Sequence, residues 1–161
     1  MKKTFFLVLV LCIAFLSSPV WADARQEADQ AFATWREALS SNKPDNVVNL
    51  YAPDAVLLAT LANKPITNHH DRMAYFTQLM KRPNLSVKVD EEFGRVLSDN
   101  AVALSGLYTF SFQDQPSVTV KVPARYTFVF VKNQDNTWQI VEHHSSKLPE
   151  RAPSEAAPQN P

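Results

Sequence analysis

The sequence has few cysteines and few glycines, and each shortage excludes a kind of site. Its one cysteine, Cys12, lies in an apolar stretch near the start of the chain, so the remainder offers no thiol, no disulfide and no cysteine metal ligand. Its two glycines, Gly94 and Gly106, form no glycine-rich loop. We therefore expect a fold that is held together by its hydrophobic core.

An excess of charge of one sign is also missing. Lysine and arginine together number 16, as do aspartate and glutamate, so the formal net charge is zero. Residues 1–22 contain Lys2 and Lys3 and no acidic residue, so the remainder of the chain has a formal charge near −2. This balance indicates neither a nucleic acid nor an anionic membrane as a partner.

Residues 1–22 have the three parts of a bacterial secretory signal peptide: a basic start, an apolar run from Phe5 to Leu16, and a small-residue site that ends at Ala22. The apolar run is too short for a transmembrane helix. We predict cleavage after Ala22, a periplasmic or secreted protein, and no membrane attachment after cleavage. One domain is expected over residues 23–149, followed by a proline-rich, disordered tail over 150–161.

Three helices are predicted in the first half of the domain. From Asp23 to Leu39 apolar residues recur every three or four positions, which is typical of an amphipathic helix with one buried stripe. A second, short helix is expected from Pro44 to Tyr51, ended by the Ala52-Pro-Asp54 segment. A third is expected over residues 68–80, with a proline three residues later as its stop.

The rest of the domain is predicted to form strands. Alternating apolar residues and short polar turns predict four long strands, over residues 85–97, 101–112, 118–131 and 137–146. Strands joined in this way form an antiparallel meander. Because the helices precede the strands, we predict an α+β fold with the helices packed on one face of the sheet.

Arg125 is a fixed cation in the most hydrophobic of these strands. Two interpretations remain open. A strand arginine commonly lies on a solvated face or pairs with a nearby carboxylate, whereas a buried guanidinium requires an anionic or strongly accepting partner, and that partner can be a ligand. The tract Glu142-His-His-Ser-Ser146, one hairpin away, favours a site.

Alternation divides the strand residues between two faces. In residues 101–112 one face carries large side chains and the other mostly small ones, and in residues 118–131 Arg125 falls on the roomier, more polar face. The opposite face carries the row Tyr126, Phe128 and Phe130. If exposed, such a row needs a second subunit to cover it, so we predict a homodimer or larger homo-oligomer.

Four motifs resemble those of a known family. They are Tyr75-Phe-x-x-Leu79, Ser105-Gly-x-Tyr-x-Phe110, Ala124-Arg-Tyr-Thr-Phe-Val-Phe130 and Trp138-x-Ile-Val-x-His-His-Ser-Ser-x-x-Pro149. Together they are similar to bacterial proteins that resemble the association (hub) domain of calcium/calmodulin-dependent protein kinase II, within the nuclear transport factor 2-like, SnoaL-like superfamily. The resemblance implies a cone-shaped fold, in which a strongly bent antiparallel sheet and N-terminal helices enclose a pocket. It also implies dimerisation through the sheet, and no kinase activity.

The resemblance also implies a ligand. The pocket of the kinase hub is anionophilic; Arg125 matches one of its arginines, whereas Gly106 and Ser145 stand at the positions of two others. A small, anionic or mixed polar ligand is therefore expected. The candidate binding residues are Arg125, His143, Ser145, Tyr75 and Tyr108. By the same match His143 and Ser145 are placed on the Arg125 side of the sheet, and His144 is left for a subunit interface.

Two alternatives to a binding protein remain. An isomerase, dehydratase or hydrolase of this superfamily would need a buried carboxylate or histidine base that faces a donor, with candidates in Asp54, Glu142, His143, Tyr51, Tyr75 and Tyr108. An oligomerisation scaffold would have a filled cone. No cofactor is expected, and no metal site, because His69, His70, His143 and His144 lack ligand spacing.

Overall fold

The computed structural model describes residues 20–149, and side chains from residue 23 onward. The predicted signal sequence up to residue 19 and the tail from residue 150 lie outside the described residues. The elements in chain order are α1 (Val20–Ser40), α2 (Pro44–Val48), β1 (Tyr51–Leu58), α3 (His69–Leu79), β2 (Ser86–Ser98), β3 (Ala101–Gln115), β4 (Val118–Lys132) and β5 (Trp138–Lys147).

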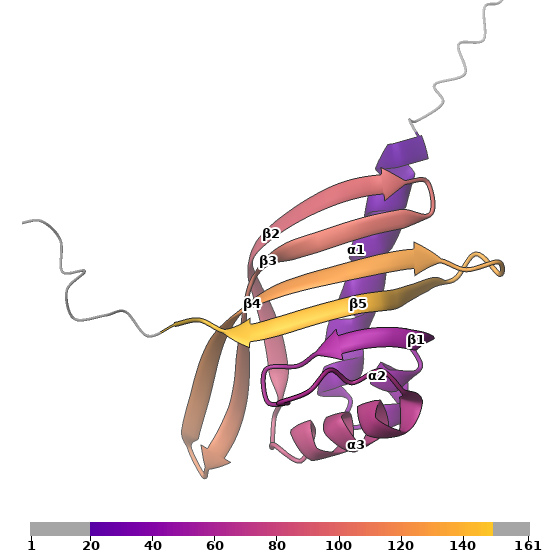
Figure 1. Cartoon of the computed structure of the whole chain (residues 1–161). Helices are drawn as coiled ribbons and strands as arrows, with labels where there is room; N and C mark the ends of the chain where they lie inside the picture. The colour runs from indigo at the N-terminus through magenta and orange to yellow at the C-terminus, as the bar shows by residue number, and fades with distance from the viewer. Residues whose placement is uncertain (1–19, 150–161) are drawn as a thin grey trace, which may run out of the picture.

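The predicted α+β class and the antiparallel meander are confirmed. Five strands form one sheet in the order β1-β5-β4-β3-β2, in which β2 to β5 pair antiparallel with their sequence neighbours. The sheet is strongly bent and does not close, with α1 across its inner face and α2 and α3 at one end (Figure 1). Helices and sheet therefore enclose a tapering interior.

The fifth strand corrects one prediction. The segment Ala52-Pro-Asp54 does not end a helix, because α2 stops at Val48 and β1 begins at Tyr51. Strand β1 pairs parallel with β5, and its register shifts between Tyr51 and Val56. The irregular part of β1 tolerates Pro53, which has no N–H to give to a ladder.

The scarcity of glycine is visible in the turns. In the described part of the chain, residues 20–149, four non-glycine residues adopt positive φ. Three of them are asparagines, the residue type that tolerates the left-handed region best after glycine: Asn42, Asn84, Asn136 and Ser117. Asparagine also begins α3, where the Asn68 side chain accepts the backbone N–H of Asp71 at 2.9 Å. Polar side chains thus take over turn positions that glycine often occupies.

The aromatic row of β4 is covered within the chain. Tyr126, Phe128 and Phe130 are at most 3% exposed, because they face α1. Phe32 of α1 lies 5.0 Å from Phe128 between ring centroids, and Trp35 lies 4.9 Å from it. The row is therefore not exposed and needs no second subunit to cover it, because the amphipathic stripe of α1 already does so.

Candidate functional site

One buried hydrogen-bond chain joins α1, β1 and β5 inside the cone. The indole N–H of Trp35 donates to the phenol oxygen of Tyr51 at 3.1 Å, and that oxygen lies 2.7 Å from Nδ1 of His143. Tyr51 and His143 are 5% and 4% exposed. The His143 ring also stacks on Phe128 at 3.8 Å between centroids. The imidazole is thus held on two sides, by a hydrogen bond and by an aromatic face.

These hydrogen bonds favour one tautomer of His143. Indole nitrogen can only donate, so the Tyr51 oxygen accepts from Trp35, and donation of the Tyr51 hydroxyl proton to Nδ1 of His143 is the arrangement that leaves no buried hydroxyl proton without an acceptor. The neutral ring then carries its proton on Nε2, which is buried without a partner. Burial, helped by the charge of His144, lowers the pKa of His143 to about 3. His143 is therefore neutral at physiological pH.

A second chain leads outward from the interior. The phenol of Tyr108 donates to Oγ of Ser145 at 2.6 Å, and Oγ1 of Thr60 lies 2.7 Å from the same Ser145 oxygen. Tyr108 is fully buried, and burial raises the pKa of its phenol. Since the Ser145 oxygen accepts the hydrogen bond from Tyr108, the proton of the Ser145 hydroxyl can point to Thr60. This series of hydrogen bonds therefore runs from the core to Thr60, two residues beyond the end of β1.

Thr60 lies where two hollows meet. A pocket of about 90 Å³ opens between α3 and the β3–β4 arm, the part of this hairpin that includes Phe110, Phe112 and Val122. A shallow groove of about 410 Å³ runs between β5 and the segment after β1, and Thr60 lies in the walls of both hollows. The smaller pocket is mostly apolar; its walls are Thr60, Leu61, Tyr75, Leu79, Arg82, Leu85, Phe110, Phe112 and Val122. Predicted site residue Tyr75 lines this pocket, and Ser145 lines the groove.

Arg82 supplies the charge at this pocket. Its guanidinium lies over the ring of Phe112, 5.1 Å from the centroid, and no ion pair or side-chain hydrogen bond within residues 23–149 involves it. Two open hollows of about 580 and 550 Å³ also have Arg82 in their walls. Burial raises the pKa of Tyr75 to about 12, although the nearby Arg82 charge acts in the opposite direction. Sequence reasoning missed Arg82.

Arg125 does not lie in the cone. It is exposed, pairs across the ladder with Leu107 and Ser146, and has the buried Ala124 and Tyr126 as its neighbours in β4. His143 and Ser145 are buried on the inner face, opposite Phe128 and Tyr126. The prediction that His143 and Ser145 share a face with Arg125 is therefore wrong. Arg125 does occupy the polar face, but that face is the outside of the cone.

A bulge explains part of the error. The β4–β5 register shifts between Val129 and Phe130, so that Ile140 and His143 are both buried although they differ by three positions. Simple alternation, which placed Ile140 on the face of His144, fails at such a bulge. The two neighbouring histidines do point to opposite faces, as predicted: His143 is buried and His144 is exposed.

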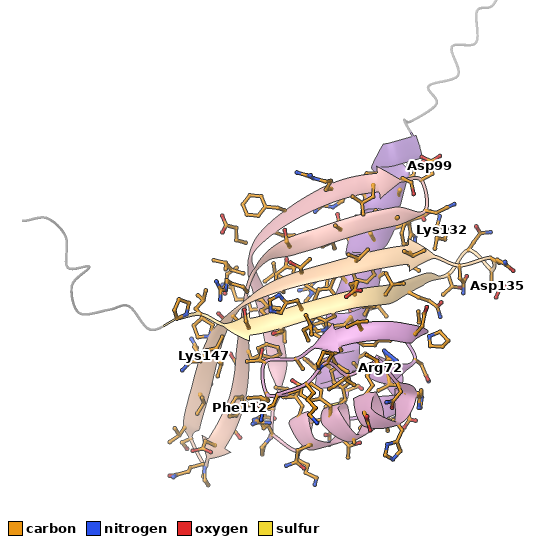
Figure 2. All side chains as sticks on the ribbon, in the orientation of Figure 1. Arg72, Asp99, Phe112, Lys132, Asp135 and Lys147 are labelled. Carbon is orange, nitrogen blue, oxygen red and sulfur yellow. The ribbon has the colours of Figure 1, made fainter. Side chains whose placement is uncertain are left out.

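Among the side chains of residues 23–149 the buried cation is Arg72, which belongs to α3 and lies against β1 (Figure 2). Its side chain is 1% exposed and donates to the carbonyls of Ala55, Pro53 and Ala52 at 3.0, 3.2 and 3.4 Å. These carbonyls belong to the irregular part of β1, where the ladder with β5 is interrupted. The sequence contains one indication that Arg72 is buried: it precedes the buried residues Phe76 and Leu79 at helical spacing.

Acid–base candidates are only partly assembled. Asp54 and Glu142 are exposed, and the buried polar or charged residues described are Arg72, His143 and Ser145, so no carboxylate faces this part of the interior. Tyr51 and His143 do meet, but they are bonded to each other. Within residues 20–149 no three side chains are grouped to hold a metal ion, and no helix is long and apolar enough to cross a membrane.

Comparisons with known proteins agree with this architecture. A putative association domain of calcium/calmodulin-dependent protein kinase II from Xanthomonas campestris has 36% sequence identity and a TM-score of 0.74, with 78% of this chain and 89% of that one covered. A putative dehydratase of the nuclear transport factor 2-like family from Streptomyces avermitilis has 12% identity and a TM-score of 0.70, covering 80% and 99%.

A third structure, a nuclear transport factor 2-like superfamily protein from Salmonella enterica serovar Typhimurium, has 16% identity and a TM-score of 0.69, with 83% and 97% of the two chains covered. The last two likenesses concern the fold. A search of curated proteins finds no match. The sequence profile of the calcium/calmodulin-dependent protein kinase II association domain matches residues 24–149, and the chain belongs to that family.

Proposed function

We propose that this chain is an exported, homo-oligomeric protein that binds a small anionic molecule in the pocket between α3 and the β3–β4 arm. One observation carries the proposal: the pocket brings an arginine without an anionic partner, Arg82, to an apolar wall and to the end of the Tyr108–Ser145–Thr60 chain. A few convergent polar groups on an apolar surface are what small-molecule sites commonly offer.

The size of the pocket limits the ligand. Its volume of about 90 Å³ is small against the roughly 300–1,000 Å³ that enclose a drug-sized molecule, so it takes a short chain or one ring. A carboxylate head then lies beside Arg82, where the neighbouring open hollows leave room for water. The hydroxyl of Thr60 can bond a second polar atom of the ligand.

Calorimetric titration of the chain lacking residues 1–22 with hexanoate and benzoate tests the site, with the corresponding amides as neutral counterparts. We expect carboxylates to bind and amides to bind more weakly. A charged hydrogen bond contributes about 1.5–3 kcal/mol, so Arg82→Met weakens carboxylate binding by roughly ten- to a hundredfold. The matched control is Arg95→Met, an exposed arginine of β2 that lines none of these hollows.

Two outcomes count against the proposal in different ways. Saturable binding with equal affinity for acids and amides, unchanged in Arg82→Met, rejects the anionic ligand but keeps the pocket. Absence of any saturable binding at millimolar probe rejects the pocket.

Export and oligomerisation are supported by other features. The leader pattern of residues 1–22 supports export, and the intact mass of protein recovered from the periplasm is expected to begin at Asp23. The name of the family refers to an association domain, which supports self-association. Light scattering is expected to give at least twice the chain mass.

A small pocket enzyme is the second candidate, and the 2.7 Å contact between Tyr51 and His143 favours it. Proton exchange into a ketone probe such as cyclohexanone, followed by NMR in D₂O, separates the two functions. A binding protein leaves the α-protons of the ketone in place, whereas an isomerase-type base replaces them by deuterium. We expect no exchange, because Nδ1 of His143 is already hydrogen-bonded to the Tyr51 hydroxyl.

A further inference from the structure

The hydrogen bonds of Ser145 give the Thr60 hydroxyl a preferred direction. The buried phenol of Tyr108 donates to Oγ of Ser145 at 2.6 Å, and Oγ1 of Thr60 lies 2.7 Å from the same oxygen. If Thr60 donated to Ser145, the proton of this buried serine hydroxyl would have no acceptor among the described residues. A buried donor without a partner costs free energy, so the favoured order of donation runs from Tyr108 through Ser145 to Thr60.

This order leaves the proton of the Thr60 hydroxyl for a ligand. The Thr60 oxygen accepts from Ser145, and a hydroxyl has only one proton to donate. No side-chain hydrogen bond within residues 23–149 uses that proton. Because Thr60 lies in the walls of both the apolar pocket and the neighbouring groove, its proton is available where the two hollows meet. Thr60 is therefore a donor at the pocket.

The other polar side chains in the pocket wall are donors as well. The guanidinium of Arg82 has no acceptor atom. The phenol oxygen of Tyr75 accepts the backbone N–H of Leu61, which leaves the phenol proton to be donated. No residue of this wall has a carboxylate or an amide side chain. A ligand group that can only donate is therefore desolvated here without a side-chain partner, whereas a group that accepts finds one.

We propose that the pocket selects short oxo acids, with the carboxylate beside Arg82 and the oxo oxygen as the acceptor for the Thr60 hydroxyl. An oxo oxygen has two lone pairs and no proton, so it matches a wall whose side chains offer donors. The inference rests on the proposed binding of a small anion and specifies the chemical class of that ligand. Tyr108 and Ser145 are positioning residues, because they act through the orientation of the Thr60 hydroxyl.

Isosteric pairs of ligands test this selection. The chain from Asp23 to Pro161 is titrated calorimetrically with 4-oxopentanoate against 4-methylpentanoate, and with 5-oxohexanoate against 5-methylhexanoate. The two lengths place the oxo group at different distances from the carboxylate. Within each pair only the group that meets Thr60 differs, so the ratio of the two affinities separates its hydrogen bond from the contact between the carboxylate and Arg82.

Three variants of the chain are titrated with the same pairs. Thr60→Val keeps the shape and removes the donor, and we expect the oxo-to-methyl affinity ratio of at least one pair to fall by roughly two- to tenfold. Ser145→Ala frees the Thr60 hydroxyl from its preferred direction and is expected to lower the ratio by a smaller factor. Thr127→Val, which changes an exposed threonine of β4 that lines neither hollow, is the control and is expected to keep the wild-type ratio.

The outcomes separate this inference from the proposed function. A packing defect weakens both acids of a pair, so a changed ratio is not its result. Acids that bind with a ratio unchanged in Thr60→Val or in Ser145→Ala overturn the selection by Thr60 and leave the anionic site standing. Absence of saturable binding for all four acids overturns both. In the wild type alone, the ¹³C signal of the oxo carbon is expected to move downfield on binding, because a carbonyl that accepts a hydrogen bond is deshielded, and an upfield or absent shift overturns the inference.

Discussion

The phenol oxygen of Tyr51 lies 2.7 Å from Nδ1 of His143 and 3.1 Å from the indole nitrogen of Trp35, so one hydroxyl links three elements of the core. Replacing it with hydrogen in Tyr51→Phe leaves a buried indole N–H and a buried imidazole nitrogen without a partner. We expect a loss of about 2–4 kcal/mol in the free energy of unfolding, measured in urea.

The matched control for this change is Tyr126→Phe. The hydroxyl of Tyr126 makes only long contacts, 3.4 Å to the carbonyl of Glu91 and 3.3 Å to the carboxylate of Glu92. Its removal is expected to cost less than about 1 kcal/mol. Equal losses in the two variants would mean that the Tyr51 hydroxyl has no special role in the core.

Acid should unfold the protein partly through His143. Burial lowers the pKa of its imidazole from 6.5 to about 3 in the folded chain. Between these values the unfolded state binds a proton that the folded state refuses, so stability falls as the pH decreases from 6.5 toward 3, by up to about 1.4 kcal/mol for each pH unit from this group. Above pH 6.5 the group contributes no pH dependence.

Two measurements check that window. The ring signals of His143 in NMR are expected to stay at their neutral position from pH 7.5 to pH 5, and the pH slope of stability over pH 6 to 4 should shrink in His143→Phe. A midpoint near 6.5 for His143 would contradict a buried, neutral imidazole.

Arg72 is expected to hold the start of β1 in place. Arg72→Met removes the donors to three carbonyls of residues 52–55, and we expect a loss of about 2–4 kcal/mol in urea unfolding together with faster amide exchange in β1. Arg72→Lys keeps the charge but not the forked donors and should recover only part. A stability within about 0.5 kcal/mol of wild type for Arg72→Met would be the behaviour of a surface residue.

The two glycines should differ in their tolerance of alanine. A Cβ on Gly106 would lie 1.9 Å from the carbonyl oxygen of Glu91, so backbone must move, at a cost of about 1–3 kcal/mol. A Cβ on Gly94 would meet the guanidinium of Arg25, which can swing away and loses a partly exposed ion pair with Glu92 worth about 0–1 kcal/mol. Thermal melts of the two variants check this order, and the reverse order would contradict it.

Much of the fold could be predicted from local pattern, and the errors arose where tertiary context decides. Apolar spacing located α1 and the four antiparallel strands to within a few residues. Strand β1 was partly read as a helix end because Pro53 looked like a stop, yet its partner is β5, some 80 residues later, through a parallel pairing that no short-range signal reports.

The site was predicted less well for a related reason. Tyr75, Tyr108, His143 and Ser145 do belong to the inner side of the cone, but the side on which Arg125 lies depends on which sheet face the helices cover. Alternation separates the two faces of a strand without saying which one is inside. Arg82 was overlooked because it follows a helix and becomes notable only through its contact with Phe112, 30 residues later.

The most direct test of the proposed binding site is an NMR titration of the isotopically labelled chain, residues 23–161, with hexanoate. We expect saturable shifts for the amide and side-chain signals of the pocket walls, with Thr60, Tyr75, Arg82 and Phe112 among the largest, and loss of these shifts in Arg82→Met. Shifts that centre on Arg125 and the outer face of the sheet, or that never saturate, would contradict it.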